Sequence, residues 1–60
     1  MNRSDAIDEA RRINGIALEV VANWKVNNAT TYLVLRSKAE VANYRNFNAN
    51  WDFTITVIED

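Results

Sequence analysis

The sequence predicts a small α+β domain of two layers. Its element order is α-β-β-α-β, and a three-stranded antiparallel sheet in the order 2-1-3 carries both helices on one face. Residues 16–26 and 51–58 alternate in polarity, as strands with one buried face do. Two other segments, 5–14 and 38–46, have helical apolar spacing. With 60 residues the chain makes one domain, 1–60.

The first predicted helix runs from Asp5 to Asn14. Ser4 has the side chain of an N-cap, and Gly15 is expected to end the helix in the left-handed conformation. Asp8 and Arg12 are four residues apart with the acidic residue first, which favours an ion pair. The apolar face consists of Ala6, Ile7, Ala10 and Ile13.

The segment from Ile16 to Arg36 predicts a β-hairpin with Asn27-Asn28 as its two loop residues. Every even position of 16–26 is apolar, and asparagine tolerates the positive φ of a type I′ turn. This register places Glu19 opposite Arg36 and gathers apolar side chains on one face. Those side chains are Val20, Ala22, Trp24, Leu33 and Leu35.

A helix is the competing interpretation of the first half of this hairpin. Several apolar residues there also satisfy helical spacing: Ile13, Ile16, Ala17, Val20, Val21 and Trp24. The hairpin is preferred because Gly15 would cost about 1 kcal/mol inside a continuous helix. The paired register also has no helical counterpart.

The second predicted helix runs from Lys38 to about Asn46. Ser37 and Glu40 have the spacing of a capping box, in which each side chain satisfies a free backbone N–H. This helix would direct Val41, Tyr44 and Phe47 toward the sheet. The alternative is that the preceding strand continues, because Ala39, Val41 and Phe47 also share a parity.

The last predicted strand covers Trp51 to Ile58 and follows a turn at Asn48-Ala49-Asn50. Aromatic and β-branched residues dominate it, and one face carries Trp51, Phe53, Ile55 and Val57. If the second helix crosses back over the sheet, this strand pairs antiparallel with the first strand. The sheet order 2-1-3 follows.

The sheet face left uncovered by both helices is predicted to bind a partner. An apolar centre ringed by polar groups is typical of an interface. The alternative is a solvated surface, because the exposed face of a one-sided sheet is often polar. The predicted partner-binding residues are Val21, Asn23, Tyr32, Val34, Arg36 and Ile58.

The strand edge at Thr30 to Arg36 is a second candidate interaction surface. It contains no proline and could accept a strand from another molecule, which in a dimer would extend the sheet to six strands. Alternatively, Arg36, Lys38 and the following helix blunt this edge. A small chain without disulfides often gains burial from a second copy, so we expect a homo-oligomer.

Composition excludes several kinds of chemistry. The chain has no histidine, cysteine or proline and one glycine, so zinc sites built from histidine or cysteine, catalytic triads and glycine-rich phosphate loops are not expected. Asp5, Asp8 and Glu9 follow no recognised metal-loop spacing. We therefore expect no catalytic residues, no metal and no cofactor. The absence of cysteine fits a reducing cytoplasm, and no apolar run reaches the length of a membrane span. We therefore expect a cytoplasmic protein that does not bind a membrane.

The first functional hypothesis is a non-enzymatic interaction protein. It would bind and inhibit or regulate a larger protein, as very small phage- and plasmid-encoded proteins do. The second hypothesis is a nucleic-acid-binding regulator whose basic residues are Arg3, Arg11, Arg12, Lys38 and Arg45. Interleaved acidic residues, a net charge of -1 and the assignment of both tryptophans to the core weigh against it. A structural subunit of a larger assembly is a third possibility.

Overall fold

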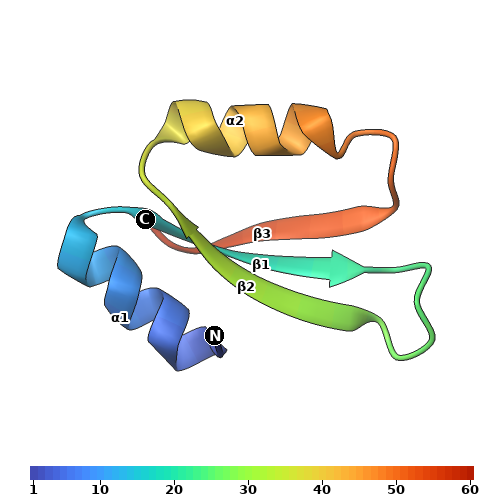
Figure 1. The fold of residues 1–60 in the computed structure, drawn as a ribbon, viewed down its shortest axis with the longest axis horizontal. Coiled ribbons are helices and arrows are strands. Elements are labelled where there is room, and N and C mark those ends of the chain that lie inside the picture. Colours follow the sequence, from blue (N-terminus) through green and yellow to red (C-terminus); the bar gives the residue numbers. More distant parts are fainter.

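The computed structural model describes residues 1–60 and shows a sheet with a helix on each side (Figure 1). The elements are α1 (Arg3–Ile13), β1 (Ile16–Ala22), β2 (Ala29–Leu35), α2 (Lys38–Phe47) and β3 (Phe53–Glu59). Both outer strands pair antiparallel with β1, in the order β2-β1-β3. The predicted α+β class, element order and sheet order are confirmed, and the helical alternative for residues 16–22 is wrong.

Helix α1 begins two residues earlier than predicted. Asn2 is its N-cap and accepts a hydrogen bond from the backbone N–H of Asp5 at 2.8 Å, so the prediction of Ser4 as the cap is wrong. The predicted pair of Asp8 with Arg12 is also wrong, because Arg12 bonds Glu9, one turn away, instead.

Helix α1 ends at Asn14, which takes the left-handed conformation (φ 58°, ψ 42°) predicted for Gly15. Gly15 is needed for another reason. A Cβ at this position would lie 2.6 Å from the backbone oxygen of Leu35, closer than any side chain allows. The glycine therefore permits close contact between the end of α1 and the end of β2.

The hairpin register differs from the prediction by four residues. Ala22 lies opposite Ala29, not Leu33, and residues 23–28 form a longer connection in which Asn28 has positive φ. The shift is even, so Leu33 and Leu35 keep the predicted face. The predicted pairing of Glu19 with Arg36 is wrong, since Glu19 lies opposite Tyr32.

Strand β3 contains an irregularity near its end. Leu18 lies opposite Val57 and Ala17 lies opposite Glu59, so Ile58 is an extra residue, as in a β-bulge. Ile58 packs beside the buried residues under α1, and Glu59 forms an ion pair with Arg11 of α1 at 3.3 Å. The bulge thus turns two successive residues toward α1.

The two helices lie on opposite faces of the sheet, and the prediction that both lie on one face is wrong (Figure 1). Under α1 the buried residues are Ala6, Ala10 and Ala17, with Tyr32, Val34 and Ile58 packed against them. Under α2 they are Ile16, Leu18, Val20 and Val41. Apolar side chains point to both faces of the sheet, so a helix packs on each face.

Helix α2 confirms the predicted helix after β2, and the alternative of a continuing strand is wrong. Ser37 accepts a hydrogen bond from the N–H of Glu40 at 3.2 Å, whereas the Glu40 carboxylate accepts from the N–H of Arg36 at 2.7 Å. Val41 is buried, but Phe47 is 86% exposed, so its predicted contact with the sheet is wrong. Neither helix has the length and apolar character needed to cross a membrane.

Candidate interaction surface

The six predicted partner-binding residues do not form one open surface. Tyr32, Val34 and Ile58 pack against the alanines of α1 and its neighbouring strand. The expectation that this face is uncovered is therefore wrong, because the sequence does not show that α1 packs on it. Binding of a partner by these residues stays a prediction.

The remaining three predicted residues are dispersed. Val21 is half-buried in β1 beyond α1, Asn23 lies at the end of the sheet, and Arg36 is exposed after β2. Glu19 also connects elements on the α1 face, since its carboxylate accepts hydrogen bonds from Arg3 of α1 at 3.3 Å and from the Tyr32 hydroxyl of β2 at 3.0 Å. These bonds join α1 and β2 to β1 on this face.

An exposed aromatic cluster lies at the opposite end of the sheet. We call Trp24, Trp51 and Phe53 the aromatic end. The ring centroids of Trp24 and Trp51 are 5.6 Å apart, and Phe53 meets Trp24 edge to face at 4.7 Å. Trp24 is 45% and Trp51 62% exposed, so their predicted assignment to the core is wrong.

Hydrogen bonds hold the two segments that form the aromatic end. The backbone N–H of Asn23 donates to the oxygen of Asp52 at 2.9 Å. The Asn23 side chain donates to Asp52 at 3.2 Å and to the Thr54 hydroxyl at 2.8 Å. These bonds join Asn23, next to Trp24, to Asp52 and Thr54 on either side of Phe53.

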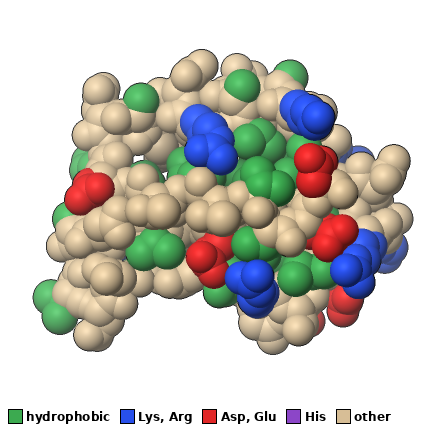
Figure 2. All heavy atoms as spheres, turned by 180° about the vertical axis from the view of Figure 1, so that it is seen from behind, with side chains coloured by type: hydrophobic (Ala, Val, Ile, Leu, Met, Phe, Trp, Pro, Cys, Tyr) green, Lys and Arg blue, Asp and Glu red, His purple; other side chains and the backbone are tan.

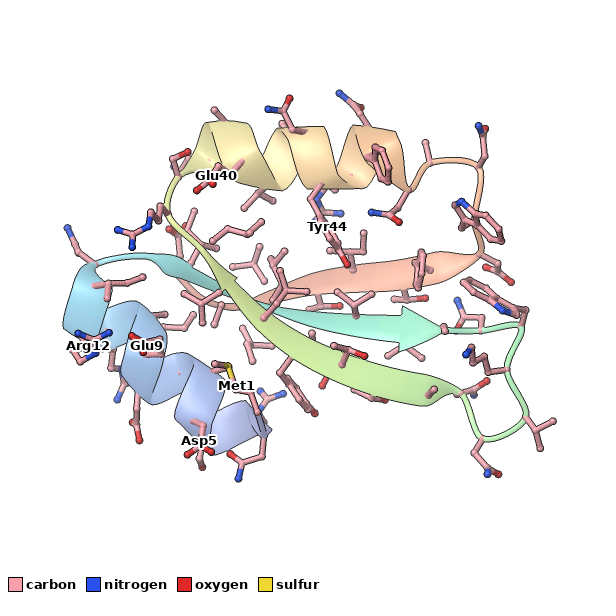
Figure 3. All side chains as sticks on the ribbon, in the orientation of Figure 1. Met1, Asp5, Glu9, Arg12, Glu40 and Tyr44 are labelled. Atoms are coloured by element: carbon pink, nitrogen blue, oxygen red, sulfur yellow. The ribbon has the colours of Figure 1, made fainter.

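A groove separates α2 from the edge strand β2. It has a volume of about 370 Å³ and is open to solvent. We call it the α2 groove; Leu35, Glu40, Asn43, Tyr44 and Phe47 line it. Figure 3 shows Tyr44 extending from α2 toward the sheet and Glu40 at the start of the helix. On the face seen from behind, apolar side chains are also visible between α2 and the sheet (Figure 2).

The charged residues are distributed unevenly between the helices. All three arginines of α1 are in ion pairs, with Glu19, Glu59 and Glu9. The remaining cations have no ion-pair partner: Lys25, Arg36, Lys38 and Arg45. No group of three or more acidic side chains is arranged to hold a metal ion. The cations without ion-pair partners therefore lie outside α1, on the two connections and on α2.

Sequence reasoning missed the aromatic end and the exposure of Phe47. Continued alternation through Trp24 and Val26 made these residues look like strand. A usable signal was present in the polar residues Asn23, Asn27 and Asn28, which indicate a longer connection.

Comparison with known proteins adds no relative. No protein-family model matches the chain, and searches of curated proteins and of solved structures find no significant match.

Proposed function

We propose that this protein is a non-enzymatic interaction module that binds a larger protein and inhibits or regulates it through the aromatic end. One observation carries the proposal. Trp24 and Trp51 contact each other and yet keep about half of their surfaces in water. Tryptophan is enriched among the residues that contribute most binding free energy in protein interfaces.

The packing of the aromatic end lowers the entropic cost of binding. Immobilising a free side chain at an interface costs about 0.5–1.5 kcal/mol. Trp24 is already held between Trp51 and Phe53, and Asn23 bonds the segment beneath it. A partner that covers these rings would therefore gain apolar burial and lose little side-chain freedom.

The other features of the molecule support a binding role over a catalytic one. The α2 groove contains one carboxylate, Glu40, and that carboxylate is bonded to the N–H of Arg36. The chain supplies no histidine or cysteine to act beside it. General acid–base and nucleophilic catalysis depend most often on those side chains.

A nucleic-acid-binding regulator is the second candidate. Both tryptophans are exposed, Lys25 follows Trp24 directly, and exposed aromatic rings can stack on bases. The ion pairs of the α1 arginines oppose this candidate. A gel shift with generic DNA and RNA at about 50 mM salt separates the two functions, since binding that weakens steeply with salt would favour nucleic acid.

The proposal is tested by affinity capture from the native host with wild-type protein and the variant Trp51→Ala. We expect a specific larger protein to be retained by the wild type and lost with the variant. Trp51 is the more exposed ring, and losing its contact with Trp24 should cost the fold about 0.5–1.5 kcal/mol. A thermal melt checks that the variant is folded.

Val26→Ala is the control, because Val26 is an apolar residue of the connection that carries Trp24 and its side chain is 89% exposed. It should retain the partner. Equal retention by wild type and Trp51→Ala, or no specific protein with either, would overturn the proposal.

A further inference from the structure

We propose that two copies of this chain form a two-fold symmetric dimer in which their β2 edges pair antiparallel and their α2 helices lie side by side over a six-stranded sheet. The partner at this surface is a second copy. The inference concerns β2 and α2, and it goes beyond the proposed role of the aromatic end.

The hydrogen-bond pattern shows which groups of β2 are open. Asn23 donates its N–H to Asp52 at 2.9 Å, so the odd residues of β1 bond to β3 and its even residues bond to β2. The even residues of β1 lie opposite odd residues of β2. The backbone groups of Thr30, Tyr32 and Val34 therefore point to the free edge.

These three residues define one register. An antiparallel pair centred on Tyr32 places Thr30 of each copy opposite Val34 of the other, and all three residues are bonded. Residues opposite each other point to the same face, so the leucines of both β2 strands lie beneath the α2 helices. No charged residue or proline occurs between Ala29 and Leu35 to oppose this pairing.

The α2 groove lies where the second copy would arrive. Glu40, Tyr44 and Phe47 form one stripe of α2 in the groove, and Leu35, the last residue of β2, also lines it. Helix α2 runs back over the sheet opposite to β2, so Phe47 lies toward the end where β2 begins (Figure 1). Antiparallel pairing brings Leu35 of the second copy to that same end. The exposed Phe47 and the groove would then be covered.

The required area explains why the groove must take part. Stable interfaces bury roughly 800 Å² on each partner, which is about a fifth of the 4228 Å² surface of this molecule. Pairing of one seven-residue edge supplies backbone bonds but little apolar area. The groove, with Leu35, Tyr44 and Phe47, adds apolar area to that of the paired edge.

Strand β3 is the other free edge, and two arguments exclude it. The free backbone groups of β3 belong to the odd residues Phe53, Ile55 and Val57. Pairing them with β2 would place Leu33 opposite Thr54, so the apolar side chains of the two strands would lie on different faces of the joined sheet. Pairing of β3 with itself gathers acidic residues at both ends. These are Asp52, Glu59 and Asp60, of which Glu59 alone has a cation partner.

The test measures mass in solution by sedimentation or light scattering. At about 100 µM we expect wild-type protein to have twice the mass of the chain. Thr30→Pro removes an N–H that points outward and leaves the bonds to β1 intact, and Phe47→Glu changes a side chain that is 86% exposed. Each should raise the dimer dissociation constant about tenfold or more, with an unchanged circular dichroism spectrum.

Val57→Pro is the matched control, because it makes the same change at an outward position of β3. It should leave the dimer intact. A monomeric wild type, a dimer that survives both Thr30→Pro and Phe47→Glu, or loss of the dimer with Val57→Pro alone would overturn the proposal. A monomer that binds a foreign extended peptide at this edge would do so as well. Trp51→Ala should not affect dimerisation, so the two proposals fail separately.

Discussion

The two helices cover the two faces of one sheet in different ways. Helix α1 packs through Ala6 and Ala10, which are 0% and 1% exposed. Helix α2 buries one residue, Val41, while Tyr44 is half-buried and Phe47 is exposed. The short side chains of α1 let it lie close to the strands, whereas the long side chains of α2 leave a groove. Side-chain size at the contact therefore decides which face is sealed.

The sealed face also carries the ion pairs between helix and strand. Arg3 and Arg11 of α1 reach Glu19 of β1 and Glu59 of β3. No ion pair joins α2 to the sheet. The difference indicates that α1 mainly stabilises the fold and that the α2 side is free for association, as proposed above.

Enlarging a buried alanine of α1 should change the free energy of unfolding more than substitution of Glu19 or Phe47 does. Ala10→Leu places a long side chain where α1 contacts the sheet, and overpacking of this kind costs about 1–3 kcal/mol. Ala42→Leu is the matched change on α2, where the residue is exposed, and should alter stability by about 0.5 kcal/mol or less. Urea denaturation measures both. Similar losses would show that the helices pack alike.

Removing the charge of Glu19 should have an intermediate effect. Glu19→Gln weakens the bonds from Arg3 and the Tyr32 hydroxyl in a partly buried place, and we expect a loss of about 0.5–1.5 kcal/mol. Glu9→Gln is the control, because Glu9 pairs only with Arg12 on the same helix and should cost about 0.5 kcal/mol or less. Thermal melts at low and high salt measure the difference. Equal losses of stability for the two variants would show that the bonds of Glu19 to Arg3 and Tyr32 add no stability.

Truncating Phe47 should have the smallest effect on the monomer. Phe47→Ala is expected to change the free energy of unfolding by about 0.5 kcal/mol or less, because the ring is exposed. Tyr44→Ala removes a half-buried ring and should cost more. Denaturation at a concentration low enough to keep the chain monomeric measures both, and a large loss with Phe47→Ala would place its ring in the core.

Alternation in the sequence predicted faces but not register. Leu33 and Leu35 share a face with Leu18 under either register, because the two differ by an even number of residues. Where β1 stops depends on contacts distant in sequence. Trp24 leaves the strand to pack on Trp51 and Phe53, a contact that no local pattern contains.

The sequence also did not predict which face of the sheet α1 covers. Its alanine stripe fits either face of a sheet, and the close approach of Gly15 to the Leu35 carbonyl is a contact between residues distant in sequence. The predicted partner surface therefore included Tyr32, Val34 and Ile58, which α1 covers. The capping serine of α2 was predictable because a cap depends on residues within one turn.

The hydrogen bond between Asn23 and Asp52 has a consequence for the chemical ageing of the protein. Deamidation of Asn23 would replace its donor nitrogen with oxygen and leave two carboxylates where a 3.2 Å bond now lies. Like charges at that separation repel, and the strain falls on the segments that carry Trp24 and Trp51. Spontaneous loss of one ammonia molecule would thus loosen the aromatic end without any change in the gene.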